Sequence, residues 1–416
     1  MRHCCVGGPW PRAFCYGTPM RVATAQHQDP DPARAVREAH AALVRELGGA
    51  PHWLFVQSSI DHDREALRRA LAGLEVPALH GSSSCLGVMT RAGAVLEGPS
   101  LALFGVRDEA GSFGVGAATP DGDGPATTAG LALERAIEAA GRQGEVPTLV
   151  WLTAAPGHEE ACIAGLEAVL GPDVPIVGGS AADNAVAGGW YQLTRDATHS
   201  HAVVVSAWFP SSRVVSAFQS GYTPTTTRGL VTRASGRTLH EIDGRPAATV
   251  YNEWTRGAIT NAMREGGGVL GDTSLFPLGR RVGEVGGVPY YRLAHPATVH
   301  LDGSIDLFAD IVEGDQLVLM EGEIDALLSR AGRVAIDARA LANLGPDDIA
   351  GALVIFCAGC MLTVRDRMDQ VVAGLQHGLG AAPFLGCFTF GEQGCFVGGE
   401  NRHGNLMISV TVFARE

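Results

Sequence analysis

The side chains best suited to chemistry include four cysteines near the end of the 416-residue chain. Cys357 follows an apolar run and Cys360 precedes a helical pattern, while Cys387 and Cys395 belong to a glycine loop. A thiol at a helix N-terminus lies near the positive end of the helix dipole, which favours the thiolate. Thiolates and an imidazole bind zinc or copper, so Cys357, Cys360, Cys387 and His403 are candidate metal ligands. A free cysteine is also a small buried hydrophobe, and this structural role stays open.

Glu392 lies between the last two cysteines, in the stretch FGEQG. Its carboxylate is placed to bind a ligand amine or to act as a base, and a salt bridge to an arginine is the alternative. All 31 residues counted as Lys+Arg are arginines. The absence of lysine excludes a lysine Schiff base, a Walker A loop, the kinase strand lysine and a Ser–Lys dyad. Arginine, backbone N–H groups or hydroxyls must therefore hold any anionic ligand.

Two further glycine loops present hydroxyls and backbone N–H groups that are suited to an anion. The candidate ligand-binding residues are Gly81, Ser82 and Ser83 in the first loop and Gly179, Ser180, Asp183 and Asn184 in the second. Ser, Asp and Asn also satisfy local backbone groups in turns, which is the alternative. The serine run is not a nucleophile elbow, because the GxSxG pattern is missing.

Three similar stretches must position these loops, each with the pattern strand, loop, helix, strand, glycine loop and a hairpin ending in an apolar strand. The expected elements are 53–56, 61–74, 76–82 and 101–104; then 149–152, 157–170, 174–180 and 202–205; then 353–356, 362–379, 382–387 and 406–410. Apolar strands separated by helices are typical of sheets covered by helices. We therefore predict an α/β fold of layered mixed sheets with helices on the outside, built from three related β-α-β-β-β units and a β-rich middle section. Chance similarity of three generic βαβ segments is the alternative.

The predicted domain boundaries follow from changes in composition and in hydrophobic pattern along the chain. Residues 1–19 hold three cysteines without an apolar core, and we expect an extension without a fold, with Met20 as the true start. The middle section contains two Asp-Gly turns and is rich in strand patterns. A joint near residue 238 divides the chain into predicted domains 20–238 and 239–416.

Composition excludes several classes of protein. The formal net charge is −13 and no basic stripe stands out, so a nucleic-acid partner is disfavoured. No apolar run approaches 18 residues, so no membrane span is expected. Nine cysteines without a secretory signal indicate a reducing, cytoplasmic location. The CxxC is not followed by His, which excludes covalent c-type haem.

Several stretches resemble the FIST family. ALHGSSSCLGV and VPIVGGSAADN are similar to signature loops of the FIST N-terminal domain. EIDGRPAATVY, DGSIDLFADIVEGDQLVLM, CAGCM, GCFTFGEQG and HGN resemble the FIST C-terminal domain, in order. The sequence departs from the family pattern where Cys360 replaces the Arg of a CAGR-like run. Gly404 also separates His403 from Asn405, whereas in the family the histidine and asparagine are usually adjacent.

The resemblance implies a bacterial, stand-alone sensor that binds a small ligand, with amino acids proposed, and acts on a separate signalling partner. The ligand would lie where the glycine loops and the CAGC strand end converge, with Cys357, Cys360, Glu392 and Asn405 among its contacts. On this interpretation no cofactor is needed. One alternative is a haem-binding nitric-oxide sensor that regulates a histidine kinase. Another is a thiol- or metal-dependent enzyme that uses the C-terminal cysteines.

Overall fold

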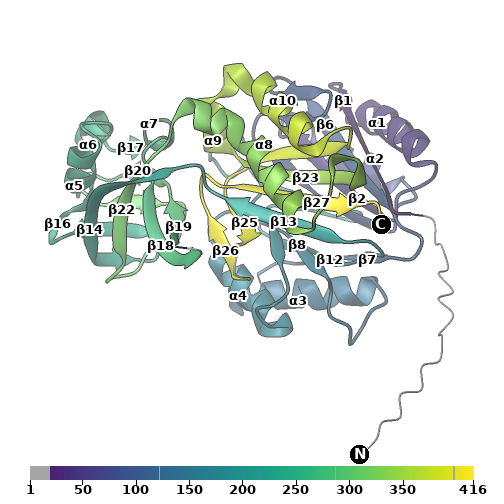
Figure 1. The fold of residues 1–416 in the computed structure, drawn as a ribbon, viewed down its shortest axis with the longest axis horizontal. Coiled ribbons are helices and arrows are strands. Elements are labelled where there is room, and N and C mark those ends of the chain that lie inside the picture. The colour runs from purple at the N-terminus through teal and green to yellow at the C-terminus, as the bar shows by residue number, and fades with distance from the viewer. Residues whose placement is uncertain (1–18, 121, 286, 397–398) are drawn as a thin grey trace, which may run out of the picture.

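A computed structural model describes residues 19–120, 122–285, 287–396 and 399–416. It consists of a large body of sheets and helices and a smaller β-rich module on the left of Figure 1. The predicted N-terminal extension, apart from Pro19, lies outside the described residues. Among the helices described, none is long and apolar enough to cross a membrane.

Three units of similar element order build the body, which confirms the predicted repeat. The first consists of β1 (Arg21–Gln28), α1 (Pro32–Leu47), β2 (Trp53–Ser59), α2 (Arg64–Ala72), β3 (Ala78–Ser84), β4 (Val88–Thr90), β5 (Gly93–Val95) and β6 (Ser100–Arg107). The second consists of β7 (Ser112–Ala118), α3 (Gly124–Ala139), β8 (Leu149–Ala154), α4 (Glu159–Leu170), β9 (Ile176–Gly179), β10 (Gln192–Thr194), β11 (Thr198–His199) and β12 (Val203–Phe209).

The third unit has the same order but is interrupted after its first strand. It consists of β13 (Val214–Gln219), α8 (Ile324–Leu341), β23 (Ile349–Cys357), α9 (Ala358–Thr363), α10 (Met368–Leu379), β24 (Phe384–Thr389), β25 (Glu392–Cys395), β26 (Asn401–Gly404) and β27 (Ile408–Ala414). Each unit therefore begins one strand and one helix earlier than the predicted repeat.

Each sheet of the body is completed by a hairpin from a different unit. The three strand orders are β1-β6-β2-β3-β10-β11, β7-β12-β8-β9-β25-β26 and β13-β27-β23-β24-β4-β5. The hairpin of the second unit thus extends the first sheet, that of the third unit extends the second sheet, and that of the first unit extends the third sheet. This cyclic exchange interlocks the units.

Glycines allow close packing of strands at corresponding places in the three units. Gly81, Gly178 and Gly386 lie in β3, β9 and β24, each opposite a strand of another unit's hairpin. A Cβ at Gly178 would lie 1.9 Å from the Leu152 carbonyl oxygen, and one at Gly386 would lie 2.5 Å from Met89 Cε. The strands can therefore pack this closely only because no side chain is present.

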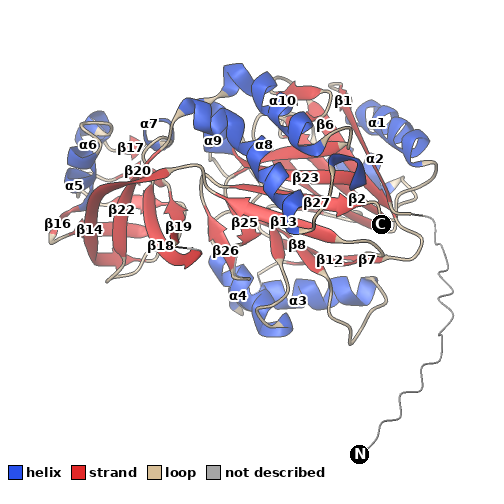
Figure 2. Cartoon of the chain, in the orientation of Figure 1, coloured by secondary structure: helices blue, strands red, loops and turns tan. Residues whose placement is uncertain are grey.

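The inner faces of the three sheets share one core, and helices cover the outer faces (Figure 2). The rings of Trp53 and Trp208 lie 4.7 Å apart, edge to face, and Trp151 stacks on Trp208 at 5.6 Å. Phe413 of the third unit packs against Trp208 at 5.3 Å. Strands such as β2 are buried on both faces, which explains why their sequences are continuously apolar.

The β module (residues 223–321) is inserted between β13 and α8. Its elements are β14 (Thr223–Ser235), β15 (Thr238–Ile242), β16 (Arg245–Pro246), α5 (Ala247–Trp254), α6 (Thr260–Glu265), β17 (Gly267–Gly268), α7 (Leu270–Thr273), β18 (Leu278–Val285), β19 (Val288–Ala294), β20 (Pro296–Val299), β21 (Ile305–Leu307) and β22 (Gln316–Glu321). The joint predicted near residue 238 falls inside this module, at the start of β15, which pairs with β14. β13 also pairs with β27, so strands from the two predicted domains share one sheet.

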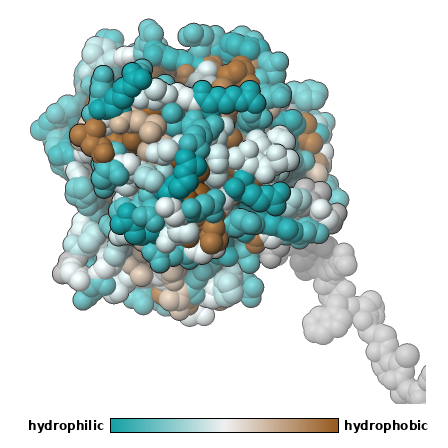
Figure 3. All heavy atoms as spheres, turned by 90° about the vertical axis from the view of Figure 1, so that its left-hand side faces the viewer, coloured by the Kyte–Doolittle hydropathy of each residue, from teal (hydrophilic) through white to brown (hydrophobic). Residues whose placement is uncertain are grey.

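Viewed from its own side, the module presents mostly hydrophilic residues with small, separate apolar groups (Figure 3). Among the module residues whose exposure the structure describes, the exposed large apolar ones are Leu230, Leu301 and Val312. The module buries its own core beneath this surface, around Leu239, Tyr251 and other residues of β15 and α5.

Candidate functional site

The loops that follow β3, β9 and β24 meet one another, each coming from a different unit. Three backbone hydrogen bonds join them in pairs: Ala182 N to Ser83 O (3.1 Å), Cys85 N to Phe388 O (3.0 Å) and Ser180 N to Gly391 O (2.8 Å). Cys357, at the end of β23, lies in register with Thr389 of β24. The structure therefore brings the glycine loops and the CAGC strand end together.

The polar side chains of the first loop bond to the protein itself. Ser82 Oγ accepts a hydrogen bond from Gln57 Nε2 at 2.8 Å. Ser83 Oγ accepts one from the backbone N–H of Tyr191 at 2.9 Å. Gly81 allows β3 to lie close to β2, because a Cβ at this position would lie 2.8 Å from a backbone oxygen. This packing role differs from the predicted role of presenting a backbone N–H group to a ligand.

In the second loop, Asp183 and Asn184 also serve the fold. The Asp183 carboxylate accepts hydrogen bonds from three backbone N–H groups of its own loop, at 2.7–2.9 Å. Asn184 Oδ1 accepts one from Leu86 N at 2.7 Å, which ties the second loop to the first. Gly179 packs against Thr389, since a Cβ there would lie 2.5 Å from Thr389 Cγ2. These contacts match the turn-forming alternative.

Ser180 instead points into a polar band carried by β25 and β26. Its hydroxyl accepts a hydrogen bond from Gln393 Nε2 at 3.3 Å, and Gln393 Nε2 also lies 3.5 Å from His403 Nδ1. His403 Nε2 and Asn405 Nδ2 both lie within hydrogen-bond distance of the Phe308 carbonyl oxygen, at 3.1 and 3.3 Å. Phe308 belongs to the β module, so the band links body and module.

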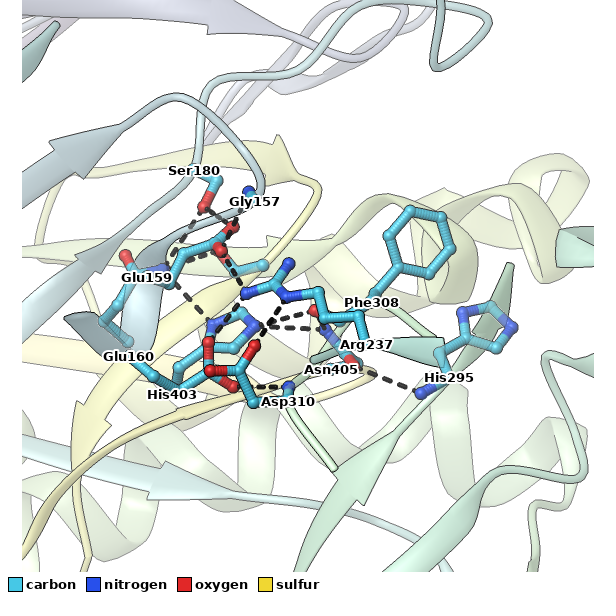
Figure 4. Close-up of polar contacts among 12 residues, drawn as sticks. Gly157, Glu159, Glu160, Ser180, Arg237, His295, Phe308, Asp310, His403 and Asn405 are labelled. Atoms are coloured by element: carbon cyan, nitrogen blue, oxygen red, sulfur yellow. Dashed lines mark hydrogen bonds and ion pairs between the residues drawn. The ribbon is translucent and has the colours of Figure 1, made fainter. Parts of the chain in front are cut away.

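A partly buried charge cluster continues the band (Figure 4). Arg237, in the turn after β14, donates from Nη2 to Glu159 Oε2 at 2.6 Å and to Glu160 Oε2 at 2.7 Å. Its Nε donates to Asp310 Oδ1 at 3.0 Å. Ser180 Oγ donates to Glu159 Oε1 at 2.7 Å. One arginine of the module thus holds two carboxylates at the start of α4.

The cluster keeps Glu159 ionised. Burial alone would raise the pKa of this carboxyl, but attraction to His403 and Arg237 and the hydrogen bond from Ser180 lower the pKa from 4.5 to about 2. Sequence reasoning missed Glu159, Glu160 and Arg237. Two acidic residues in the first turn of a helix are common, because they interact favourably with the helix dipole. The sequence around them gives no sign that they pair with an arginine far along the chain.

The same cluster contains ligand atoms suited to a cation. Within the described residues, one carboxylate oxygen each from Glu159 and Glu160 and one ring nitrogen of His403 lie within 4.8 Å of one another. Arg237 already pairs with both carboxylates, so a metal ion would have to compete with its guanidinium. In the part of the chain that the structure describes, no single cluster contains the candidate metal ligands Cys357, Cys360, Cys387 and His403. His403 lies next to Glu159 and Glu160 instead.

The cysteines divide between two environments. Cys360 lies beneath the module, with Sγ 3.2 Å from Arg330 Nη2 and 3.5 Å from the Tyr222 hydroxyl. Cys387 faces the shared core between the sheets, 3.9 Å from the Val354 carbonyl oxygen. Burial raises the pKa of the Cys387 thiol. Cys387 therefore has the environment of a structural cysteine.

Glu392 is fully buried and is held by Thr389 and Met407. Its Oε1 accepts from Thr389 Oγ1 at 2.9 Å and its Oε2 from Met407 N at 3.0 Å. Burial raises the pKa of this carboxyl well above its usual range. The salt bridge to an arginine that the sequence allowed is not formed within the described residues.

A groove of about 700 Å³ lies on the body, along β13 and α8, and one residue of the module, Tyr290, reaches its lining. Its lining is mainly apolar and includes Val215 and Phe218 of β13, Ala340 of α8, Phe396 after β25 and Tyr290 of β19. Asp337 and Gln219 add a polar end, where Gln219 Nε2 donates to Asp337 Oδ2 at 2.9 Å. The groove is thus an amphipathic space on the body, with Tyr290 of the module at its edge.

Two protein-family models match the sequence and show which family it belongs to. The FIST N domain matches residues 52–245, and the FIST C domain matches residues 247–395. The chain belongs to the FIST family. FIST domains are associated with the sensing of small ligands in signal transduction. No match was found among curated proteins.

Solved structures show only distant likeness. A cyanuric acid hydrolase from A. caulinodans is 15% identical over 48% of this chain and 71% of its own, with a TM-score of 0.28. A second structure of cyanuric acid hydrolase is 11% identical over 96% of this chain and 100% of its own, with a TM-score of 0.36. PurLQS from Thermotoga maritima is 9% identical over 96% and 73%, with a TM-score of 0.19. Such likeness carries no inference about function.

Two departures from the FIST pattern can now be placed in space. Cys360 stands where an Arg was expected, and a different arginine, Arg330 of α8, contacts its thiol. Gly404 separates His403 from Asn405, yet both side chains still converge on one carbonyl oxygen of the module. In this FIST protein both departures occur where the body meets the module.

Proposed function

We propose that this FIST protein is a small-ligand sensor whose ligand binds between the body and the β module. The observation that carries the proposal is the groove of about 700 Å³, because Tyr290 of the module joins the residues of the body in lining it. A ligand that contacts both Tyr290 of the module and β13 of the body would bind more tightly to some placements of the module relative to the body than to others. Differential affinity of this kind is what shifts a conformational population.

The lining suggests the chemistry of the ligand. Phe218, Phe396 and Val215 favour an apolar portion, and the Asp337 carboxylate at the rim favours an amine or another hydrogen-bond donor. A small amphipathic molecule that carries an amino group fits this description. A separate signalling protein would read the resulting position of the module, whose outer face is largely hydrophilic.

A thermal-shift screen of amines, amino acids and related metabolites tests the proposal. At a ligand concentration 100 times Kd, binding stabilises the folded state by about 2.7 kcal/mol, which gives a clear rise in Tm. The variant Ala340→Trp places an indole in the groove from an exposed helix position and should abolish the shift.

Ala139→Trp, at an exposed position of α3 outside the groove, is the matched control and should keep the shift. If no compound stabilises the protein, or if Ala340→Trp responds as the wild type does, the groove is not the ligand site.

A further inference from the structure

Arg330 is a buried cation without a carboxylate partner. The side chain lies on α8, and the residue is only 1% exposed. Nη1 donates to the Leu406 carbonyl oxygen at 3.0 Å, and Nη2 donates to Cys360 Sγ at 3.2 Å. Among the described residues, Arg330 forms no salt bridge with Asp or Glu. A buried charge is costly unless it is paired, so the structure requires an anion at this place.

The thiolate of Cys360 supplies that anion. Burial opposes ionisation, but hydrogen bonding from Cys357 and attraction to Arg330 lower the pKa of Cys360 to about 6. Burial raises the pKa of Cys357 well above its usual range. The CxxC therefore holds one thiolate and one thiol side by side, at the junction of β23 and α9.

The pair lies beneath the two chain segments that join the module to the body. Tyr222 contacts Cys360 and also donates its hydroxyl proton to the Ser274 carbonyl oxygen of the module at 2.7 Å. A Cβ at Gly221 would lie 2.3 Å from Arg330 Cδ, and one at Gly322 would lie 2.5 Å from Tyr222 Cε1. Both joining segments are thus packed directly on the group that holds the thiolate.

We propose that Cys357 and Cys360 form a redox-active dithiol at the joint of the β module, which exchanges with small-molecule disulfides. The proposal does not depend on the ligand groove. Cys360 Sγ⁻ attacks one sulfur of the reagent RSSR, forming a mixed disulfide and releasing RS⁻. Cys357 then loses its proton to that thiolate and attacks Cys360 Sγ, and a second RS⁻ leaves.

The exchange balances without another reactant. The two cysteines lose two electrons and form one S–S bond, while the reagent gains two electrons and leaves as RSH and RS⁻. Because both cysteines are buried, the reaction occurs when the joint opens locally. The disulfide removes the anion beside Arg330, so the oxidised joint is less stable.

Peptide mass spectrometry tests the proposal on the full chain. The protein is incubated with 2-hydroxyethyl disulfide, blocked with maleimide and digested with trypsin. Cleavage after Arg339 and Arg365 yields a peptide that contains Cys357 and Cys360 as its only cysteines. We expect this peptide to be lighter by two hydrogen atoms and unlabelled, while Cys387, equally buried but without a cation, keeps its free thiol.

Variants identify the roles within the pair. Cys357→Ser should trap the reagent on Cys360 as a mixed disulfide. Arg330→Met should slow the reaction about tenfold or more, because the thiolate loses its counter-charge. Arg333→Met, an exposed change one turn along the same helix, should leave the rate unchanged.

Hydrogen exchange of the wild type should rise at residues 220–222 and 322–323 on oxidation. The proposal is overturned if Cys387 reacts as fast as Cys360, if both thiols of the pair remain free, or if Arg333→Met slows the reaction as much as Arg330→Met.

Discussion

Loss of the Arg237 side chain should destabilise the protein in a way that depends on pH. In Arg237→Met, the buried Glu159 and the partly buried Glu160 remain near one another without their cation. The pKa of Glu159 is lowered from 4.5 to about 2, which at 1.36 kcal/mol per pH unit corresponds to about 3 kcal/mol of stability near neutral pH. His403 and Ser180 share in this lowering of the pKa with Arg237. Removing one partner of a buried pair costs about 3–5 kcal/mol, so we expect a loss of about 2–3 kcal/mol in Arg237→Met.

The sign of the pH dependence follows from the direction of the pKa shift. A carboxyl whose pKa is lowered in the folded state contributes stability above pH 4.5, and this contribution is lost as the pH falls toward about 2. The variant should therefore differ most from the wild type near pH 7. The difference should shrink toward pH 3, because Glu159 becomes protonated in the folded variant.

Urea unfolding at pH 7 and pH 4, followed by tryptophan fluorescence, measures the effect. The double variant Arg237→Met, Glu159→Gln should lose less than the sum of the single losses, since the uncompensated charge is gone. Arg233→Met is the matched control, because its pair with Glu241 is largely exposed and is worth at most about 1 kcal/mol. A loss below about 1 kcal/mol in Arg237→Met, or an equal loss at both pH values, would refute the reasoning.

Three further predictions concern the body. Gly178→Ala should lower the free energy of unfolding in urea by more than about 2 kcal/mol, because its Cβ would overlap the Leu152 carbonyl oxygen. Gly271→Ala is the control and should be nearly neutral, because a Cβ there meets open space. A large loss in Gly271→Ala would show that the protein is destabilised by any glycine replacement and not by this overlap. Burial lowers the pKa of His80 from 6.5 to about 3, so His80→Gln should weaken the loss of stability on acidification between these values, and unchanged acid sensitivity would exclude His80 as a source. Asn401→Ala should cost about 1–3 kcal/mol, because two or more buried backbone groups of the second unit lose their partner, and a change near zero would show that water replaces it.

The sequence predicted the repeated unit because apolar runs, helix patterns and glycine loops are local features. Pairing of strands is not local, since a strand buried on both faces carries no mark of its neighbour. The exchange of hairpins, such as the register of Cys387 opposite Val88, was therefore beyond sequence reasoning. β13 was not assigned to the third unit for the same reason, because its partner strand β27 lies almost two hundred residues further along the chain.

The candidate site was predicted in part. Ser180 and His403 both contact Gln393, whereas Cys360 lies in a separate group with Arg330. The loops that carry Ser180, Cys360 and His403 were recognisable by their glycines and cysteines. Arg237 and Arg330 were missed because each is one of 31 arginines and neither has a local signature. Their roles arise from burial and from partners on other elements, which only the folded chain defines.

The cyclic exchange of hairpins also determines when the body can finish folding during synthesis. The hairpin of the first unit, β4 and β5, pairs with β24, almost three hundred residues later in the chain. Until β24 leaves the ribosome, this hairpin has no sheet to join. The sheet of the second unit likewise stays incomplete until β25 and β26 have been synthesised. Such long-range closure is slow and leaves strand edges open in the meantime. A nascent chain that stalls within the module would therefore expose two incomplete sheets, which makes it a substrate for chaperones rather than a folded half.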